Sequence, residues 1–252
     1  MCLILFSWKF HPKYKLVLAA NRDEFYARPT AKADYWIENK NMIAGTDLQA
    51  GGTWIGITKT GRLAAITNYR DPKNLDANAT SRGKLTTDFL NSLEKPEDYL
   101  ERVQVEGNHF NGYNLLVGDS EDLFYFNNVN NEIKKVESGV FGLSNGFFQE
   151  NWPKLEKGRN ALQKIVNKET IEREDLFTIL SDNQIAPDDE LPKTGIPFEW
   201  ERALSPLFIK TEEYGTRCST LIFMDYQNGG TFEEKTYQVD GWQQESHVVL
   251  NF

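Results

Sequence analysis

Segments with strand character and segments with helix character come in blocks along this chain rather than in strict alternation. Apolar, β-compatible runs fill the first third, and two helical patterns follow. Strand patterns return in the middle, two more helical patterns come next, and the last block reads as a hairpin. This block order favours an α+β layered fold over a doubly wound parallel sheet. No linker separates two self-sufficient blocks, so we expect one domain over residues 1–252.

The expected elements follow from apolar runs, turn residues and helical spacing. The predicted strands cover residues 3–10, 15–20, 53–58, 63–67, 113–118, 123–127, 133–136, 140–144, 217–226 and 232–239. Asn228-Gly229-Gly230 joins the last two, and Asn-Gly between alternating strands is a strong hairpin signal. The predicted helices cover residues 81–93, a segment beginning at Pro96, and residues 153–166 and 171–181. Residues 185–206 contain four prolines and are expected to form a long surface loop.

Charge and cysteine content exclude several classes of protein. The formal net charge of −9 argues against a nucleic-acid partner, which needs a basic stripe, and against a polybasic membrane patch. No apolar run approaches the roughly 20 residues of a transmembrane helix, and the opening residues lack the pattern of a signal peptide. Two cysteines cannot form a disulfide framework. We therefore expect a cytoplasmic, reduced protein with no membrane span; its oligomeric state stays open.

Motifs for metals and nucleotides are missing from the sequence. His11, His109 and His247 stand alone, without the cysteine or carboxylate neighbours of a zinc motif. The pair Gly51-Gly52 precedes a predicted strand rather than a helix, and no Walker or dinucleotide fingerprint occurs. We expect no metal and no required cofactor.

Cys2 is the residue with the most suggestive position. An initiator methionine is normally removed when the second residue is small, and Cys2 would then carry both a thiol and a free α-amine. The reference pKa of such an amine is about 7.7–8.0, so it is partly unprotonated near neutral pH. One residue would supply nucleophile and base together, as in N-terminal nucleophiles. The alternative is a small buried residue at the start of a strand.

Four polar residues, Asn21-Arg22-Asp23-Glu24, directly follow the apolar run 16–20. A hairpin between the first two strands would place this end beside Cys2. Strand alternation puts Asn21 and Asp23 on one face and Arg22 and Glu24 on the other. The alternative is a solvated entry into a loop.

Several segments together resemble one known family. They are Met1-Cys2, Asn21-Arg22-Asp23-Glu24-Phe25, Gly51-Gly52-Thr53-Trp54-Ile55-Gly56, Thr67-Asn68-Tyr69-Arg70 and Gly215-Thr216-Arg217-Cys218-Ser219-Thr220. This is the NRDE family, also called transport and Golgi organization protein 2. It is distantly similar to N-terminal nucleophile hydrolases of the choloylglycine hydrolase and penicillin acylase type. The resemblance implies a four-layer αββα sandwich with mostly antiparallel sheets.

The same resemblance implies roles for individual residues. Cys2 matches the cysteine that attacks an amide, and Asp23 falls where those enzymes place an aspartate that contacts the nucleophile's amine. Asn68 resembles the first oxyanion-hole position, and Asn145 resembles the asparagine that donates its side-chain amide to the same oxyanion. Losing one such donor typically costs about 10²–10³ in rate, because charge develops there in the transition state.

One departure concerns the cation near the nucleophile. Those enzymes carry an arginine three positions before the aspartate, where this chain has Ala20. Arg22 is adjacent to Asp23 instead, and alternation points it away from the Asp23 side unless the strand bulges. Without a nearby cation the thiolate is less stabilised. Arg217 could supply the charge from the C-terminal strand, or could lie in a surface ion pair at the sheet edge.

Two functions stay open. The first is a cysteine amidohydrolase or acyltransferase that acts on a small acylated substrate through Cys2. Trp54, Tyr69 and Phe147 could then line an apolar pocket beside the two asparagines, although aromatic residues also serve as core. The second is a non-catalytic carrier on the same fold, for which the resemblance implies a role in haem trafficking or lipid metabolism, with haem or an acyl lipid as the ligand.

Overall fold

Two antiparallel β-sheets lie face to face in the computed structural model, which describes residues 2–106, 109–238 and 243–252. The first sheet has the strand order β10 (Gly139–Leu143), β1 (Cys2–Trp8), β2 (Tyr14–Phe25), β11 (Tyr214–Asp225), β12 (Gly230–Tyr237) and β13 (Gln244–Asn251). The second has the order β3 (Thr30–Tyr35), β4 (Met42–Asp47), β5 (Ile55–Thr58), β6 (Leu63–Asn68), β7 (Tyr113–Gly118), β8 (Leu123–Asn127) and β9 (Glu132–Lys135).

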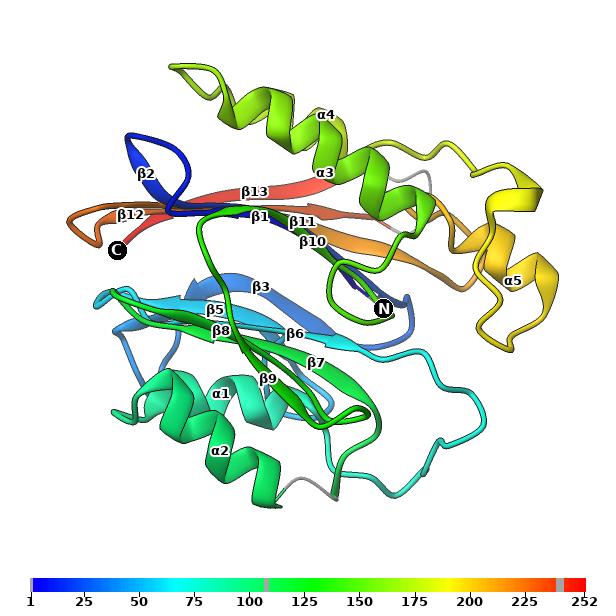
Figure 1. The fold of residues 1–252 in the computed structure, drawn as a ribbon, viewed down its shortest axis with the longest axis horizontal. Helices are drawn as coiled ribbons and strands as arrows, with labels where there is room; N and C mark the ends of the chain where they lie inside the picture. Colours follow the sequence, from blue (N-terminus) through cyan, green and yellow to red (C-terminus); the bar gives the residue numbers. More distant parts are fainter. Residues whose placement is uncertain (1, 107–108, 239–242) are drawn as a thin grey trace.

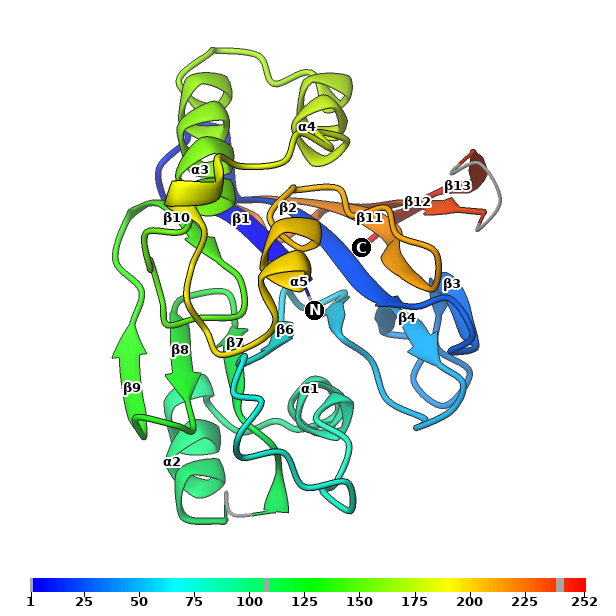
Figure 2. The same ribbon diagram turned by 90° about the vertical axis from the view of Figure 1, so that its right-hand side faces the viewer.

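Helices cover the outer face of each sheet (Figure 1). Helices α3 (Pro153–Val166) and α4 (Arg173–Leu180) contact strands of the first sheet. Helices α1 (Gly83–Asn91) and α2 (Pro96–Glu106) contact strands of the second. Figure 2 shows the resulting order of layers from the side: helix, sheet, sheet, helix. The expectation of a four-layer αββα sandwich with antiparallel sheets is confirmed.

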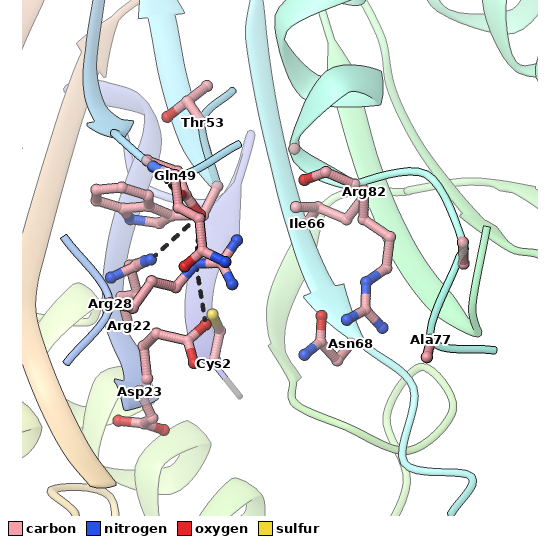
Figure 3. A pocket seen from close by; sticks show the side chains of 16 residues that line it. Cys2, Arg22, Asp23, Arg28, Gln49, Thr53, Ile66, Asn68, Ala77 and Arg82 are labelled. Atoms are coloured by element: carbon pink, nitrogen blue, oxygen red, sulfur yellow. Dashed lines mark hydrogen bonds and ion pairs between the residues drawn. The ribbon is translucent and has the colours of Figure 1, made fainter. Parts of the chain in front are cut away.

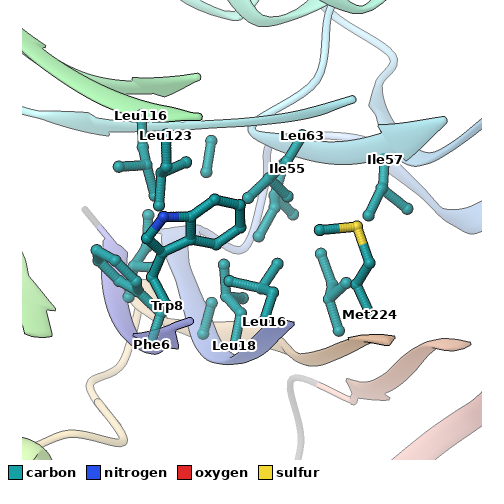
Figure 4. Packing of buried hydrophobic residues seen from close by; sticks show 14 of the residues in the cluster. Phe6, Trp8, Leu16, Leu18, Ile55, Ile57, Leu63, Leu116, Leu123 and Met224 are labelled. Atoms are coloured by element: carbon teal, nitrogen blue, oxygen red, sulfur yellow. The ribbon is translucent and has the colours of Figure 1, made fainter. Parts of the chain in front are cut away.

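Alternation along β1 separates two of the apolar cores. Ile4, Phe6 and Trp8 belong to the cluster between the sheets, whereas Leu3 and Leu5 pack toward α3 and α4. Figure 4 shows the ring of Trp8 between side chains of the two sheets. A third cluster lies between the second sheet and α1 and α2. Cys2 is two residues before Ile4, so its side chain projects toward the second sheet, at the end of the sandwich where β1 begins.

Several elements differ from the sequence expectation. Strands β3, β4 and β13 were not predicted. Strands β3 and β13 are largely polar and lie at sheet edges, and β4 is an internal strand whose short run MIAGTD does not alternate clearly. The prediction of a loop at residues 185–206 is wrong in part, since η2 (Asp188–Glu190) and α5 (Phe198–Ala203) lie within it. Helix α5 is too short for a clear helical pattern and is fixed by a buried ion pair, 2.6 Å long, between Arg70 and Glu201. Residue 239, the last of the predicted strand 232–239, and Met1 lie outside the described residues.

Candidate active site

Register across the first sheet places Arg22 directly beside Cys2. Cys2 pairs with Arg22 of β2, and Arg22 pairs with Cys218 of β11. Side chains of directly paired residues project from the same face of a sheet. Cys2 and Arg22 therefore both face the second sheet, while Asp23 faces the helices, as alternation predicted.

This arrangement puts a cation beside Cys2 although position 20 is Ala20. Arg22 shares the face of Cys2, not that of Asp23, without a bulge between β1 and β2. Its guanidinium lies 4.3 Å from the centroid of the Trp54 ring, a cation–π contact. Its Nη1 donates to Thr30 Oγ1 at 3.0 Å. Burial raises the pKa of the Cys2 thiol, and the charge of Arg22 acts in the opposite direction.

A pocket of about 350 Å³ opens beside Cys2 at this end of the sandwich. Five of the predicted site residues line it together: Cys2, Arg22, Asp23, Trp54 and Asn68. Figure 3 shows that these lining side chains stand on two opposite sides of the pocket. We call Cys2, Arg22 and Arg28 the thiol wall, and Ile66, Asn68 and Arg82 the amide wall.

Asp23 lies behind the thiol wall in a buried polar cluster. Only 1% of its surface is exposed. The Thr216 hydroxyl donates to Asp23 Oδ1 at 2.7 Å, and the Tyr214 hydroxyl donates to the backbone carbonyl oxygen of Asp23 at 2.9 Å. Burial raises the pKa of the Asp23 carboxyl, and the charge of Lys154 on α3 is among the influences that oppose this. Lys154 is 4% exposed, and its burial lowers its own pKa to about 8. A buried lysine was not predicted, because its position on α3 looks like an ordinary helix residue.

The two asparagines are joined across the gap between the sheets. Asn145 Nδ2 donates to the carbonyl oxygen of Asn68 at 2.8 Å. The neighbouring Ser144 hydroxyl donates to the carbonyl oxygen of Cys2 at 3.1 Å. Asn145 is fully buried and is not part of the pocket lining, so it holds Asn68 rather than facing the pocket. Its role as an oxyanion donor stays a prediction.

Arg217 lies elsewhere. It is the extra residue where the register of β11 shifts between Thr216 and Cys218, a β-bulge. Its Nη1 donates toward the carbonyl oxygens of Phe25 at 3.0 Å and Arg28 at 2.9 Å, and its side chain lines a different pocket. The structure does not bring Arg217 to the Cys2 pocket. Arg217 instead holds the turn after β2 through hydrogen bonds, and Arg22 is the cation beside the thiol.

The predicted aromatic pocket is also different from the observed one. Tyr69 and Phe147 pack on each other with ring centroids 4.8 Å apart, but neither lines the Cys2 pocket. Trp54 does line it, and its ring lies against the Arg22 guanidinium. The pocket lining is mostly polar and charged.

Four charged residues of the lining were not among the predicted site residues: Glu24, Arg28, Asp47 and Arg82. Asp47 Oδ2 lies 2.7 Å from Arg28 Nε, and its Oδ1 accepts from the backbone N–H groups of Gln49 and Ala50. Arg82 directly precedes α1, and its Nη1 donates to the Gly112 carbonyl oxygen at 3.0 Å. The sequence did contain a signal for Arg82. A cation at a helix N-terminus is unfavourable for the helix dipole, so its presence there indicates a role other than stabilising the helix.

The side chains described around Cys2 do not form a metal or haem site. In the described ranges, no group of three or more histidine, cysteine or acidic side chains could hold a metal ion. The Cys2 pocket offers haem iron one soft ligand, Cys2, and little apolar surface, so the lining does not fit haem and we derive no step through it. Among the described residues, no helix has the length and apolar character needed to cross a membrane.

Comparison with known proteins gives one consistent result. The family model described as Transport and Golgi organisation 2 matches residues 1–239. The Transport and Golgi organization 2 homolog of Mus musculus is 34% identical over 259 residues, with 94% of this chain and 93% of the relative covered. The Drosophila melanogaster Transport and Golgi organization protein 2 is 29% identical over 266 residues, covering 94% and 92%.

A solved structure shares the fold. The C2A mutant of the conjugated bile acid hydrolase from Clostridium perfringens aligns with a TM-score of 0.56. The alignment covers 100% of this chain and 92% of that chain, at 9% sequence identity. At this identity the likeness concerns the fold alone.

Proposed function

Because the chain belongs to the Transport and Golgi organisation 2 family and has an N-terminal nucleophile hydrolase fold, we propose that it is a cysteine amidohydrolase or acyltransferase acting through Cys2. One observation carries the proposal: Cys2, Arg22, Asp23 and Asn68, from three strands in two sheets, line the same pocket. Charged groups gathered around a partly exposed thiol are typical of a reactive cysteine.

The proposed reaction begins after removal of Met1. Cys2 Sγ adds to the carbonyl carbon of an acyl substrate while the thiol proton passes to the α-amine of Cys2. Asn68, on the opposite wall, donates to the oxyanion. The C–N bond then breaks, and the leaving amine takes the proton back from the α-ammonium. Water or an acceptor amine attacks the thioester, which releases the acyl group and restores the thiol.

The surrounding residues have separate tasks in this scheme. Arg22, stacked on Trp54, stabilises the thiolate form. Asp23 lies buried behind Cys2, where a carboxylate favours the ammonium form that appears during proton transfer. The bond from Asn145 fixes the position of Asn68.

The test combines intact-protein mass measurement with a panel of small acyl amides. We expect a mature protein that begins at Cys2, and an acyl adduct on Cys2 that is absent from Cys2→Ala. Cys218→Ala is the matched control, because Cys218 is buried and is not part of the Cys2 pocket lining. Retention of Met1, or full activity in Cys2→Ala, would overturn the proposal. Ligand binding without any turnover would favour the carrier function instead.

A further inference from the structure

Arg82 differs from the other cations of the Cys2 pocket in its partners. Arg28 Nε lies 2.7 Å from Asp47 and 3.9 Å from Glu24, and Arg22 Nη2 lies 3.7 Å from Asp47. Within the described part of the chain, Arg82 has no carboxylate at ion-pair distance. The charges of the thiol wall are thus neutralised by the protein, and the charge of the amide wall is not.

The environment of Arg82 makes this unpaired charge costly. The side chain is half-buried, and burial lowers the pKa of its guanidinium. Its hydrogen bond to the Gly112 carbonyl uses one N–H group and fixes the orientation of the planar guanidinium. A guanidinium has five N–H donors, so the N–H groups that do not bond Gly112 can still donate to a ligand. Carboxylates and phosphates match this geometry in two parallel hydrogen bonds.

The backbone places Arg82 firmly at the pocket. Gly52, in the loop between β4 and β5, packs directly on Gly83; a Cβ at Gly52 would lie 2.6 Å from the Gly83 carbonyl carbon. The first turn of α1 contains no acidic residue, so the positive end of its dipole adds to the charge of Arg82. Ala77 and Ala79, which have small side chains, also line the pocket. Figure 3 shows Arg82 beside Asn68, across the pocket from Cys2 and Arg22.

We propose that Arg82 binds an anionic group of the substrate, a carboxylate or a phosphate, while Cys2 attacks the carbonyl of the same molecule. The substrates would then be small polar acyl compounds with a negative charge near the scissile bond. The catalytic part of this inference rests on the proposed function of Cys2. The anion site itself rests on the pocket alone.

Selective alkylation of Cys2 tests the anion site without turnover. Iodoacetate and iodoacetamide both alkylate a thiolate with loss of iodide, and they differ in carrying a carboxylate or a neutral amide. We expect Arg82→Met to lower the ratio of the iodoacetate rate to the iodoacetamide rate by about tenfold, as for loss of a charge-assisted hydrogen bond. Arg82→Lys should keep part of the ratio. Peptide mapping by mass spectrometry separates Cys2 from Cys218.

Lys84→Met is the matched control. It removes the same charge from the first turn of the same helix, but Lys84 is exposed, pairs with Asp88 at 2.8 Å and does not line the pocket. An unchanged ratio in Arg82→Met, or an equal fall in Lys84→Met, would overturn the anion site.

Protection experiments identify the anion. Acetate and inorganic phosphate are added separately, and the slowing of iodoacetamide alkylation at Cys2 is measured in wild type and in Arg82→Met. Protection that needs Arg82 supports the site, and the stronger protector indicates a carboxylate or a phosphate substrate. Protection by neither anion would overturn it. Anion selectivity in a protein that forms no acyl adduct would reject the catalytic function and leave the anion site standing.

Discussion

The two walls of the Cys2 pocket contain similar arginines in opposite electrostatic situations. On the thiol wall, Asp47 lies at ion-pair distance from Arg22 and Arg28, and Glu24 from Arg28, so two carboxylates balance the two cations before any ligand arrives. On the amide wall, Arg82 contacts a backbone carbonyl and no carboxylate in the described ranges. In the proposed function, a balanced cation tunes the nucleophile and an unbalanced one recognises the substrate. Changes on either side of the pocket should therefore affect different measured quantities.

The largest effect is expected for Lys154→Met, behind the thiol wall. The pKa of Lys154 is about 8 in the fold, against 10.5 for an ordinary lysine, so between these values the unfolded chain holds a proton that the folded chain has released. The free energy of unfolding should rise with pH across this window in wild type, by about 3 kcal/mol in total. Urea unfolding between pH 7.5 and pH 10.5 should show this rise in wild type and not in Lys154→Met. If the free energy of unfolding changes with pH in the same way in wild type and in Lys154→Met, Lys154 does not have the lowered pKa.

Arg22→Met should damage the thiol wall itself. Removing the cation that shares the face of Cys2 leaves the thiolate less stable, and we expect kcat/KM to fall by about 100-fold, or roughly 3 kcal/mol of transition-state stabilisation. The pH profile of Cys2 alkylation should also move to higher pH, because the charge of Arg22 lowers the thiol pKa. Arg22→Lys should restore part of both quantities. A profile that does not move would show that Arg22 acts only through its packing on Trp54.

Gly52→Ala should disturb the amide wall without changing any charge. The new methyl group would meet the backbone of Gly83, so the start of α1 has to shift. We expect a loss of stability of about 1–3 kcal/mol and weaker anion selectivity at Cys2. Gly51→Ala is the comparison, because a Cβ there meets open space and its cost comes from a positive φ of 75°. If Gly52→Ala and Gly51→Ala show the same anion selectivity at Cys2, the Gly52–Gly83 contact does not position Arg82.

The smallest effect is expected for Arg82→Met in steady-state kinetics. A residue that holds the substrate equally in the ground state and the transition state changes KM and leaves kcat nearly constant. We expect KM for an anionic acyl substrate to rise about tenfold, and KM for its neutral amide analogue to stay the same. A fall in kcat with constant KM would instead place Arg82 at the oxyanion.

The sequence predicts the thiol wall better than the amide wall, and the reason is physical. Alternation along one strand is local, so the faces of Arg22 and Asp23 follow from their order in the chain. The family resemblance adds the layers and the position of Asn68. In contrast, Arg82 reaches the pocket from a segment before α1, and contacts between distant parts of the chain, the packing of Gly52 on Gly83 and the hydrogen bond of Arg82 to Gly112, hold it there.

Sheet register sets a second limit on prediction. The bulge at Arg217 turns that side chain toward the carbonyl groups of the turn after β2, and nothing in the local sequence indicates the shift. The polar edge strands β3 and β13 are missed for a related reason, since their pairing rather than their composition holds them in place.

The hydrogen bond from Asn145 to Asn68 has a consequence for substrate size. Apolar contacts between two sheets have no preferred direction and permit sliding, whereas a hydrogen bond fixes an offset. This bond joins the sheets close to the pocket, so it holds the spacing between the thiol of one sheet and the guanidinium beside the other. Under the proposed function, the amide of Asn145 therefore sets the distance between thiol and guanidinium, and we expect ligands to be selected by the length of chain between their carbonyl carbon and their negative charge.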